Sequence, residues 1–303
     1  MTAARSRHVA TLLLVGITAI WGSTFFLIRD VVLEMPPADF LAVRFTIAAV
    51  AMLAVFRRPM LALNRREIQV GIGLGILFAI AQILQTVGLT HTDASRSGFI
   101  TGTYVVLTPI LTAVLLRERI PRSTWIAVLM ATGGLATLSL NGFGFGFGES
   151  LTLIAAVFYA LHIIGLGQFS SPGSAAGLSV VQMVVIAIVS LVAAAPGGIA
   201  LPDGAGAWAS VLYMALMAGA VAIWAQTWAQ SHLPATRAAI VMTLEPVFAA
   251  GFAVSLGGEP MTVRMFLGGA MVLAAMYTVE LIGRRTDANA EQNPPAELLH
   301  HEV

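Results

Sequence analysis

Residues 85–96 read QTVGLTHTDASR, and residues 226–237 read QTWAQSHLPATR. The two stretches share Gln, Thr, His, Ala and Arg at the same places, and each residue of the second lies 141 positions after its partner. The same offset carries Glu118 onto Glu259. A nearly constant offset over most of both halves indicates an internal duplication. A slightly smaller offset of 138 pairs Trp21 with Tyr159 and Arg44 with Gln182.

The chain that surrounds this repeat is too apolar for a water-soluble protein. Of its 303 residues, 58% are hydrophobic and only 10% are charged, whereas soluble globular proteins carry about 25% charged residues. The net charge of +1 is too small for electrostatic binding to nucleic acid. The absence of Lys and Cys excludes a P-loop, a Schiff-base lysine, a disulfide framework and a thiolate zinc site. We therefore expect a membrane protein that does not bind nucleic acid.

Stretches long enough to cross a bilayer follow one another along the chain, since a membrane-spanning helix needs about 20 mostly apolar residues. Turn-forming and charged residues separate them, as at 34–39 and 57–59. The predicted fold is an all-α polytopic membrane protein with ten transmembrane helices. We place the helices at 9–28, 40–56, 68–89, 97–116, 123–140, 149–169, 176–195, 207–229, 236–256 and 263–283.

The arginine residues indicate the orientation of these helices. With a cytoplasmic amino terminus, twelve arginines fall in inner segments and three in outer segments, and the remaining one, Arg44, lies inside a span. Such an excess on one side follows the positive-inside rule. Both termini are therefore predicted in the cytoplasm. The inner set is Arg5, Arg7, Arg57, Arg58, Arg65, Arg66, Arg117, Arg119, Arg122, Arg237, Arg284 and Arg285, and the outer set is Arg29, Arg96 and Arg264.

The duplication divides the ten helices into two sets of five. We assign residues 1–143 to the first five-helix repeat, 144–148 to a linker, 149–285 to the second repeat and 286–303 to a disordered cytoplasmic tail. Because five is odd, the second copy enters the membrane in the opposite orientation, and the fold is expected to be two inverted five-helix repeats. Two such halves can open a shared site to either side of the membrane, which indicates alternating access.

Short motifs give the chain a family resemblance. Trp21-Gly22-Ser23 stands in the first helix and Leu244-Glu245-Pro246-Val247-Phe248 in the ninth, while Glu118-Arg119 and Gly258-Glu259 follow the fourth and ninth helices. With these motifs, residues 9–285 resemble the EamA-type exporters of the drug/metabolite transporter superfamily, and most of all the bacterial exporters of aromatic and other amino acids.

The resemblance implies a location and a function. The location is the bacterial cytoplasmic (inner) membrane. The function is secondary export of amino acids or related small amphipathic metabolites through a central cavity lined by helices one, three, four, six, eight and nine. The superfamily also transports drugs and other metabolites, so an exporter of nucleosides or cationic drugs, or an uncoupled facilitator, is the alternative.

Glu245 is the most informative single residue, since it lies about ten residues into an apolar span and is followed by Pro246. A carboxylate in hydrocarbon needs a partner or a function. It can couple transport to protons, hold a substrate amine, or stabilise a proline kink through a hydrogen bond to another helix. His162, one turn after Tyr159 in the sixth helix, is the second coupling candidate, with an interhelical hydrogen bond as its structural alternative.

Several amide and aromatic side chains complete the candidate substrate site. Phe78, Gln82 and Gln85 share one stripe of the third helix, where the amides could bind the ends of an amino acid or join helices. Aromatic rings suit a broad apolar pocket, although packing is the leading explanation for any single one of them. The substrate-binding set is Trp21, Phe78, Gln82, Gln85, Tyr104, Tyr159, His162, Trp224 and Glu245.

Arg44 has two interpretations. It could bind a substrate carboxylate, but its position five residues into the second helix favours an arginine that reaches the outer interface or pairs with Asp39 or Glu34.

The sequence holds none of the motifs of a membrane-embedded enzyme, such as His-Glu-x-x-His or Gly-x-Ser-x-Gly. We expect no enzymatic activity, no cofactor and no metal. The expected partners are a small-molecule substrate and the lipid bilayer, with protons as one choice of coupling ion and a monomer as one choice of assembly.

Overall fold

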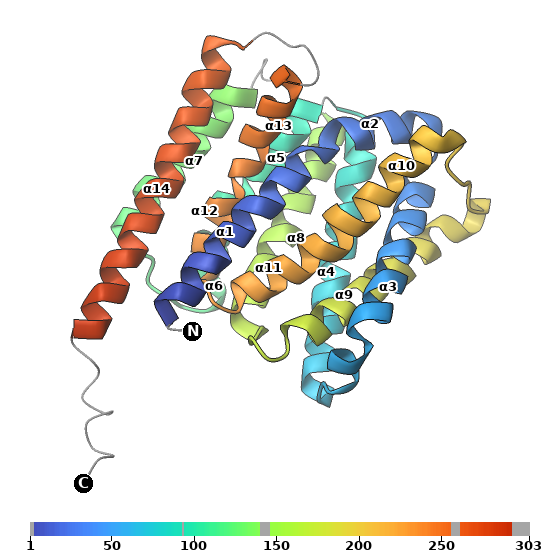
Figure 1. The fold of residues 1–303 in the computed structure, drawn as a ribbon. Helices are drawn as coiled ribbons and strands as arrows, with labels where there is room; N and C mark the ends of the chain where they lie inside the picture. Colours follow the sequence, from blue (N-terminus) through green and yellow to red (C-terminus); the bar gives the residue numbers. More distant parts are fainter. Residues whose placement is uncertain (1–2, 93, 140–145, 256–260, 293–303) are drawn as a thin grey trace.

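The computed structural model of the chain describes residues 3–92, 94–139, 146–255 and 261–292. Within these ranges every regular element is a helix and none is a strand, which confirms the all-α prediction. Figure 1 shows them as a bundle of long helices. In chain order they are α1 (Ala3–Gly22), α2 (Thr24–Glu34), α3 (Pro37–Leu61), α4 (Arg65–Leu89), α5 (Ala94–Gly102), α6 (Tyr104–Leu115), α7 (Arg122–Ser139), α8 (Phe147–Phe169), α9 (Ala175–Ala194), the 3₁₀ turn η1 (Ala195–Gly197), α10 (Gly204–Ala215), the π-helix η2 (Leu216–Val221), α11 (Ala222–Gln230), α12 (Ala235–Met242), α13 (Leu244–Ser255) and α14 (Val263–Gln292).

The ten predicted spans correspond to ten segments of helix, some made of two pieces. The pairs α1–α2, α5–α6 and α12–α13 form the first, fourth and ninth segments, and α10, η2 and α11 form the eighth. By length and composition, six of the described helices can cross a membrane, and two shorter ones are similarly apolar. The chain is therefore an integral membrane protein whose helices match the predicted positions.

Two predicted boundaries differ from the structure. Helix α14 continues to Gln292, so residues 286–292 of the predicted disordered tail are helical. Helix α8 begins at Phe147, inside the predicted linker. The rest of the predicted tail and residues 140–145 lie outside the described residues. The helical extension is polar, which a hydropathy pattern assigns to a tail because it measures apolarity rather than backbone conformation.

Side-chain hydroxyl groups mark the breaks inside the first, fourth and ninth segments. The residues between the paired helices are Ser23, Thr103 and Thr243, and each hydroxyl bonds the backbone carbonyl three residues earlier. At Thr103 and Thr243 the same carbonyl also accepts the backbone N–H of that residue, so the hydroxyl adds a second bond to it at the break. The Ser23 hydroxyl also lies 2.7 Å from the hydroxyl of Tyr213, which ties the first break to α10.

The two halves of the chain pack against each other in reciprocal pairs. Helix α3 packs along α9, and α7 packs along α14; Figure 1 shows both pairs. The third segment packs on the sixth and seventh, and in the same way the eighth packs on the first and second. The fourth packs on the sixth, as the ninth does on the first. Each of these contacts therefore has a counterpart in which the two halves are exchanged.

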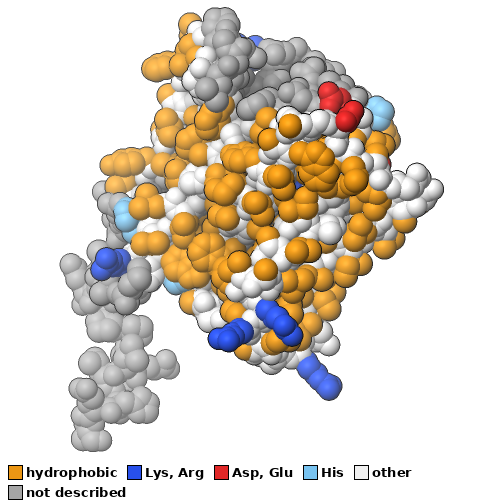
Figure 2. Space-filling model, turned by 45° about the vertical axis from the view of Figure 1, so that its right-hand side comes forward, with side chains coloured by type: hydrophobic (Ala, Val, Ile, Leu, Met, Phe, Trp, Pro, Cys, Tyr) orange, Lys and Arg blue, Asp and Glu red, His pale blue; other side chains and the backbone are white. Residues whose placement is uncertain are grey.

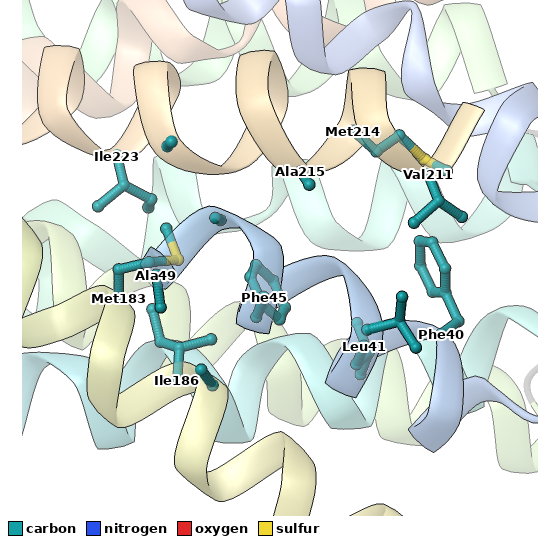
Figure 3. Close-up of a cluster of buried hydrophobic side chains, with 14 of the residues drawn as sticks. Phe40, Leu41, Phe45, Ala49, Met183, Ile186, Val211, Met214, Ala215 and Ile223 are labelled. Atoms are coloured by element: carbon teal, nitrogen blue, oxygen red, sulfur yellow. The ribbon is translucent and has the colours of Figure 1, made fainter. Parts of the chain in front are cut away.

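A core of bulky side chains holds the second, seventh and eighth segments together. Figure 3 shows Phe40 and Phe45 of α3 facing Met214 and Ala215 of α10, with Met183 of α9 beside them. All five side chains are buried. This core therefore holds α3 between α9 and α10.

The outer surface is apolar over the middle of the bundle. Val50, Val55, Leu129, Val192 and Phe266 are each more than 60% exposed, which suits side chains that contact lipid rather than water. On the face in Figure 2, hydrophobic side chains cover the middle, arginine side chains gather toward one end and acidic side chains lie at the other.

Candidate functional site

A cavity lies between the two halves, in the middle of the bundle. The space between its lining atoms is about 760 Å³, including the part that is open to the outside. Its lining comes from all six helical segments that the family resemblance implied and also from the second segment, through Arg44. The lining residues are Trp21, Thr24, Ile28, Arg44, Phe78, Gln82, Gln85, Thr86, Leu89, Ser97, Thr101, Tyr104, Tyr159, His162, Ile163, Gln226, Met242 and Glu245.

Eight of the nine substrate-site candidates lie in this lining, and Trp224 does not. The Trp224 ring stacks on Phe56 of α3, with 6.0 Å between ring centroids. It therefore packs within the core instead of facing the cavity. The sequence places Trp224 at a suitable depth in the membrane, but depth does not determine which side of a helix faces the cavity.

A chain of hydrogen bonds joins the amides of α4 to the neighbouring helices. Gln82 Nε2 donates to the Tyr159 hydroxyl (2.8 Å), which donates to Gln85 Oε1 (2.7 Å). Gln85 Nε2 donates in turn to the Thr101 hydroxyl of α5 (2.9 Å). In this conformation the two glutamines join helices, and the Gln85 carbonyl and amino groups both have partners.

Aromatic rings cover the apolar part of the wall. The Phe78 ring lies edge-on to Tyr159, with 5.7 Å between centroids, and 5.1 Å from the His162 ring. Tyr104 is 3% exposed. The Trp21 indole Nε1 donates to the backbone carbonyl of Ala218 (2.9 Å). These contacts hold the rings in place, so this apolar part of the cavity wall has a defined shape.

Arg44 is in neither of the two positions that the sequence favoured, which were the outer membrane interface and a pair with Asp39 or Glu34. It does not reach the interface, because it is 3% exposed, and the Asp39 carboxylate instead accepts a hydrogen bond from the backbone of Ala200 (3.0 Å). Arg44 Nε donates to the carbonyl of Met214 (3.2 Å), and its guanidinium lies 4.9 Å from the centroid of the Phe45 ring. The interface interpretation of Arg44 was therefore wrong, and the side chain is part of the cavity wall.

Both carbonyls that hold Trp21 and Arg44 belong to the π-helical region of the eighth segment. Ala218 lies within η2, and Met214 lies two residues before it. A π-turn shifts the regular hydrogen-bond pattern, and such turns are common at functional sites. The positions of these two cavity residues therefore depend on the local winding of this segment.

Glu245 lies at the start of α13, beside the break at Thr243. Pro246 therefore occupies the first turn of a new helix, where its missing N–H is not needed, rather than kinking a continuous helix as expected. The backbone of Gly22 packs directly against this turn, since a Cβ added at Gly22 would lie 2.7 Å from the Glu245 carbonyl oxygen. The two most diagnostic sequence motifs are thus in contact. Among the residues that the structure describes, no hydrogen bond or ion pair reaches the Glu245 carboxylate.

His162 is fully buried, and its Nε2 lies 2.8 Å from Gln182 Oε1 of α9. Its other ring nitrogen, Nδ1, has no hydrogen-bond partner within the described structure. The interhelical hydrogen bond expected as the structural alternative for His162 is therefore present, and Nδ1 remains for another role.

Gln226 was missed as a site residue. It is 2% exposed, and its Nε2 donates to Gln230 Oε1 (3.0 Å), while its own Oε1 has no partner within the described structure. A signal for it was present in the sequence, because Gln226 is the repeat partner of Gln85. Within the described ranges, no group of three or more His, Asp or Glu side chains could hold a metal ion.

Comparison with known proteins shows that the chain is similar to membrane transporters. The chain is 32% identical over 275 residues to an uncharacterized transporter of Archaeoglobus fulgidus, covering 91% of this chain and 87% of that protein. It is 27% identical to the uncharacterized inner membrane transporter YedA of Escherichia coli, covering 86% and 87% of the two chains. A crystal structure with 19% sequence identity matches 92% of this chain and 99% of its own, with a TM-score of 0.76, which supports the fold.

The family assignment rests on both halves. The model of one transporter family matches residues 8–140 and again residues 146–281. The chain therefore belongs to the EamA-like transporter family.

Proposed function

We propose that the chain is a secondary transporter that exports amino acids or related small amphipathic metabolites from the cytoplasm by alternating access. The observation that carries this proposal is the presence of one guanidinium group, Arg44, and one carboxyl group, Glu245, in the wall of the same apolar cavity. Burying a charge in hydrocarbon costs several kcal/mol unless it has a partner. A molecule with both a carboxylate and an ammonium group would supply a partner for each, while the aromatic wall accepts its apolar part.

The packing of the two halves supports alternating access. The contacts between them are reciprocal, so exchanging the conformations of the halves would preserve the same pairs of helices. This is the property that two inverted repeats, residues 1–143 and 149–285, would need to open the cavity to either side.

The cavity lies nearer to one end of the bundle than to the other, as expected for one state of an alternating-access cycle. Its wall reaches Ile28 of α2, Leu89 at the end of α4 and Ser97 of α5. Toward the end of the bundle where α1 begins, small side chains such as Ala10 and Ala239 pack together and close it. With cytoplasmic termini, the conformation described is closed toward the cytoplasm.

Reconstituted vesicles test the function directly. We expect vesicles loaded with one amino acid to accumulate the labelled form by counterflow, with saturation. Arg44→Gln should lower the initial rate at least about tenfold, because a charged hydrogen bond contributes about 1.5–3 kcal/mol. Counterflow of nucleosides or cationic drugs without that of any amino acid would favour the alternative substrate class, and flux without saturation would favour a facilitator. Absence of any counterflow would refute the proposal.

Single-cysteine labelling tests the orientation, and the chain has no Cys of its own. Ala62 lies between α3 and α4, and Leu201 between α9 and α10; both are exposed. A membrane-impermeant maleimide should label Leu201→Cys in intact cells, but Ala62→Cys only after permeabilisation. The reverse pattern would contradict cytoplasmic termini.

The same reagent tests alternating access. Ala239 in α12 and Ala131 in α7 are both fully buried, in different clusters. In inside-out vesicles, Ala239→Cys should react when the transporter opens toward the cytoplasm, and a transported amino acid should change its labelling rate. Ala131→Cys, in the pair of helices α7 and α14, is the matched control and should stay protected. Equal protection of both positions during transport would argue against this motion.

Proton coupling is the remaining part of the proposal, with Glu245 and His162 as the candidate groups. Glu245→Gln keeps the shape of the side chain and removes its charge change, so it should flatten the dependence of counterflow on pH. An unchanged pH profile in Glu245→Gln and in His162→Gln would exclude both as coupling groups.

A further inference from the structure

Hydrogen bonding fixes the direction in which the Gln226 amide points. Gln230 Nε2 donates to the backbone carbonyl of Ile163 (2.8 Å), and a carbonyl can only accept. Gln230 must therefore present its own carbonyl oxygen to Gln226, which answers with its amino group (3.0 Å). The Gln226 carbonyl oxygen is left over as an acceptor, and it has no partner in the described structure.

The same reasoning fixes the state of His162. The amino group of Gln182 faces the carbonyl of Leu178 and the hydroxyl of Thr227, and that hydroxyl already donates to the carbonyl of Ile223. Gln182 Oε1 therefore accepts from His162 Nε2 at 2.8 Å. In the neutral ring the proton is then on Nε2, and Nδ1 is a second acceptor without a donor.

These two acceptors belong to one region of the cavity wall. The bonds through Gln182 and Gln230 join His162 and Ile163 of α8 to the neighbouring residues Thr227 and Gln226 of α11. Gln226 Nε2 also lies 3.8 Å from the sulfur of Met242, three residues before Glu245. Glu245, Gln226 and His162 thus all line the same cavity. The Gln226 Oε1 and His162 Nδ1 atoms are covered by neighbouring atoms in this conformation, and neither they nor the Glu245 carboxylate has a donor among the described residues.

The first half of the chain provides the comparison. Gln85, the repeat partner of Gln226, uses both ends of its amide, because Tyr159 donates to its oxygen and Thr101 accepts from its nitrogen. The offset of 138 pairs Tyr159 with Trp21, and the Trp21 N–H donates to Ala218 instead. The Gln226 carbonyl oxygen in the second half therefore lacks a donor, whereas the corresponding Gln85 oxygen in the first half has one.

We propose that Gln226 Oε1, His162 Nδ1 and Glu245 form a subsite for a primary ammonium group of the substrate. A buried acceptor without a donor costs about 1–3 kcal/mol, and a primary ammonium has three N–H groups, one for each acceptor. A quaternary ammonium has the charge but no N–H, so it would leave the two neutral acceptors unpaired. This inference rests on the proposed function and adds the residues that select the amino end.

Four probes test the subsite, built on a phenyl ring because the cavity wall is aromatic. They are L-phenylalanine, phenethylamine without the carboxylate, 3-phenylpropanoate without the amine, and N,N,N-trimethylphenylalanine without N–H groups. Calorimetry on the purified full-length protein measures the dissociation constant of each. We expect phenylalanine to bind at least about tenfold more tightly than its trimethyl derivative, and phenethylamine to bind more tightly than 3-phenylpropanoate.

Variants then assign this preference to residues. Gln226→Met and His162→Leu remove one acceptor each, and each should reduce the preference of phenylalanine over the trimethyl compound about tenfold. Gln85→Met is the matched control, because it makes the same change at the repeat partner. Gln85→Met should weaken the binding of both compounds by the same factor and leave the ratio of their dissociation constants unchanged. Melting temperatures of all variants show whether each remains folded.

The results separate the inference from the proposed function. The decisive quantity is the ratio of the dissociation constants of the trimethyl derivative and phenylalanine. If this ratio is near one in the wild type, or if Gln226→Met and His162→Leu leave it unchanged, the subsite is overturned while amino-acid export stands. Tight binding of 3-phenylpropanoate alone would also overturn it and leave export of other amphipathic metabolites. If no probe binds and no amino acid shows counterflow, both proposals fall. Two variants keep the test decisive if one of them fails to fold.

Discussion

The close contact between Gly22 and α13 allows a quantitative prediction for Gly22→Ala. An added Cβ would lie 2.7 Å from the Glu245 carbonyl oxygen and 2.9 Å from the Ala249 nitrogen, and both are backbone atoms that cannot rotate away. Ordinary contact begins at 3.4 Å, so α1 and α13 would have to separate by about 0.7 Å. A gap of 0.5–1 Å loses about a quarter to a half of the dispersion energy of the atoms concerned, and overpacking typically costs about 1–3 kcal/mol.

Gly16→Ala is the matched control, because it makes the same change in the same helix. A Cβ at Gly16 would meet no atom within 4 Å. Replacing a helical glycine by alanine otherwise stabilises a protein by about 0.5–1 kcal/mol. The gain from helix propensity cancels when the two variants are compared, so their difference reports the steric cost alone.

Thermal unfolding of the purified protein in detergent measures this difference. At about 2–4 °C for each kcal/mol, Gly22→Ala should melt about 2–12 °C below Gly16→Ala, and Gly16→Ala should melt at or above the wild type. Because Gly22 lies between Trp21 and the turn that carries Glu245, Gly22→Ala should also slow counterflow. If Gly22→Ala proves as stable as Gly16→Ala, the close approach of α1 to α13 is refuted.

Three further predictions concern individual side chains. Trp21→Phe keeps a ring but loses the hydrogen bond to Ala218 (2.9 Å); it should lower the melting temperature by about 2–4 °C, for about 1 kcal/mol, and an unchanged value would show that the bond contributes nothing. Arg44→Lys keeps the charge but loses the fork of N–H groups and the stacking on Phe45, so counterflow should fall several-fold; a wild-type rate would show that charge alone suffices. Thr243→Val should destabilise the protein by about 1 kcal/mol in the same melting assay, because without the hydroxyl the Ile240 carbonyl at the helix break would accept only the 3.2 Å bond from the Thr243 backbone N–H. Thr132→Val, whose hydroxyl bonds the Val128 carbonyl inside the continuous helix α7, is its control and should melt like the wild type.

The positions of the membrane-spanning segments could be predicted from the sequence, because each is a long apolar run with polar ends. The breaks inside them could not. Ser23, Thr103 and Thr243 interrupt three of the segments, yet serine and threonine are common in uninterrupted membrane helices, where their hydroxyls bond backbone carbonyls in the same way. The π-helix at 216–221 gave no signal either, since its residues are apolar throughout.

The sequence placed several polar side chains of the apolar spans correctly in the cavity wall. A shared helical stripe identified Gln82 and Gln85, depth in the span identified Glu245, and all three line the cavity. Depth failed for Trp224, which faces the core, and for Arg44, whose position near a helix end suggested the interface. The cavity extends toward that end of the bundle, and only tertiary packing determines this.

The winding of the eighth segment has a consequence for how such chains can diverge. A π-helix accommodates one residue more than an α-helix of the same length. Deleting a single residue between Leu216 and Val221 would restore regular winding and leave α11 in nearly the same orientation relative to α10. Gln226 would stay in the cavity wall, but the carbonyls of Met214 and Ala218 would return to a regular helical pattern and move relative to Arg44 and Trp21. In this segment, a one-codon deletion could alter substrate selection as much as any replacement in the cavity itself.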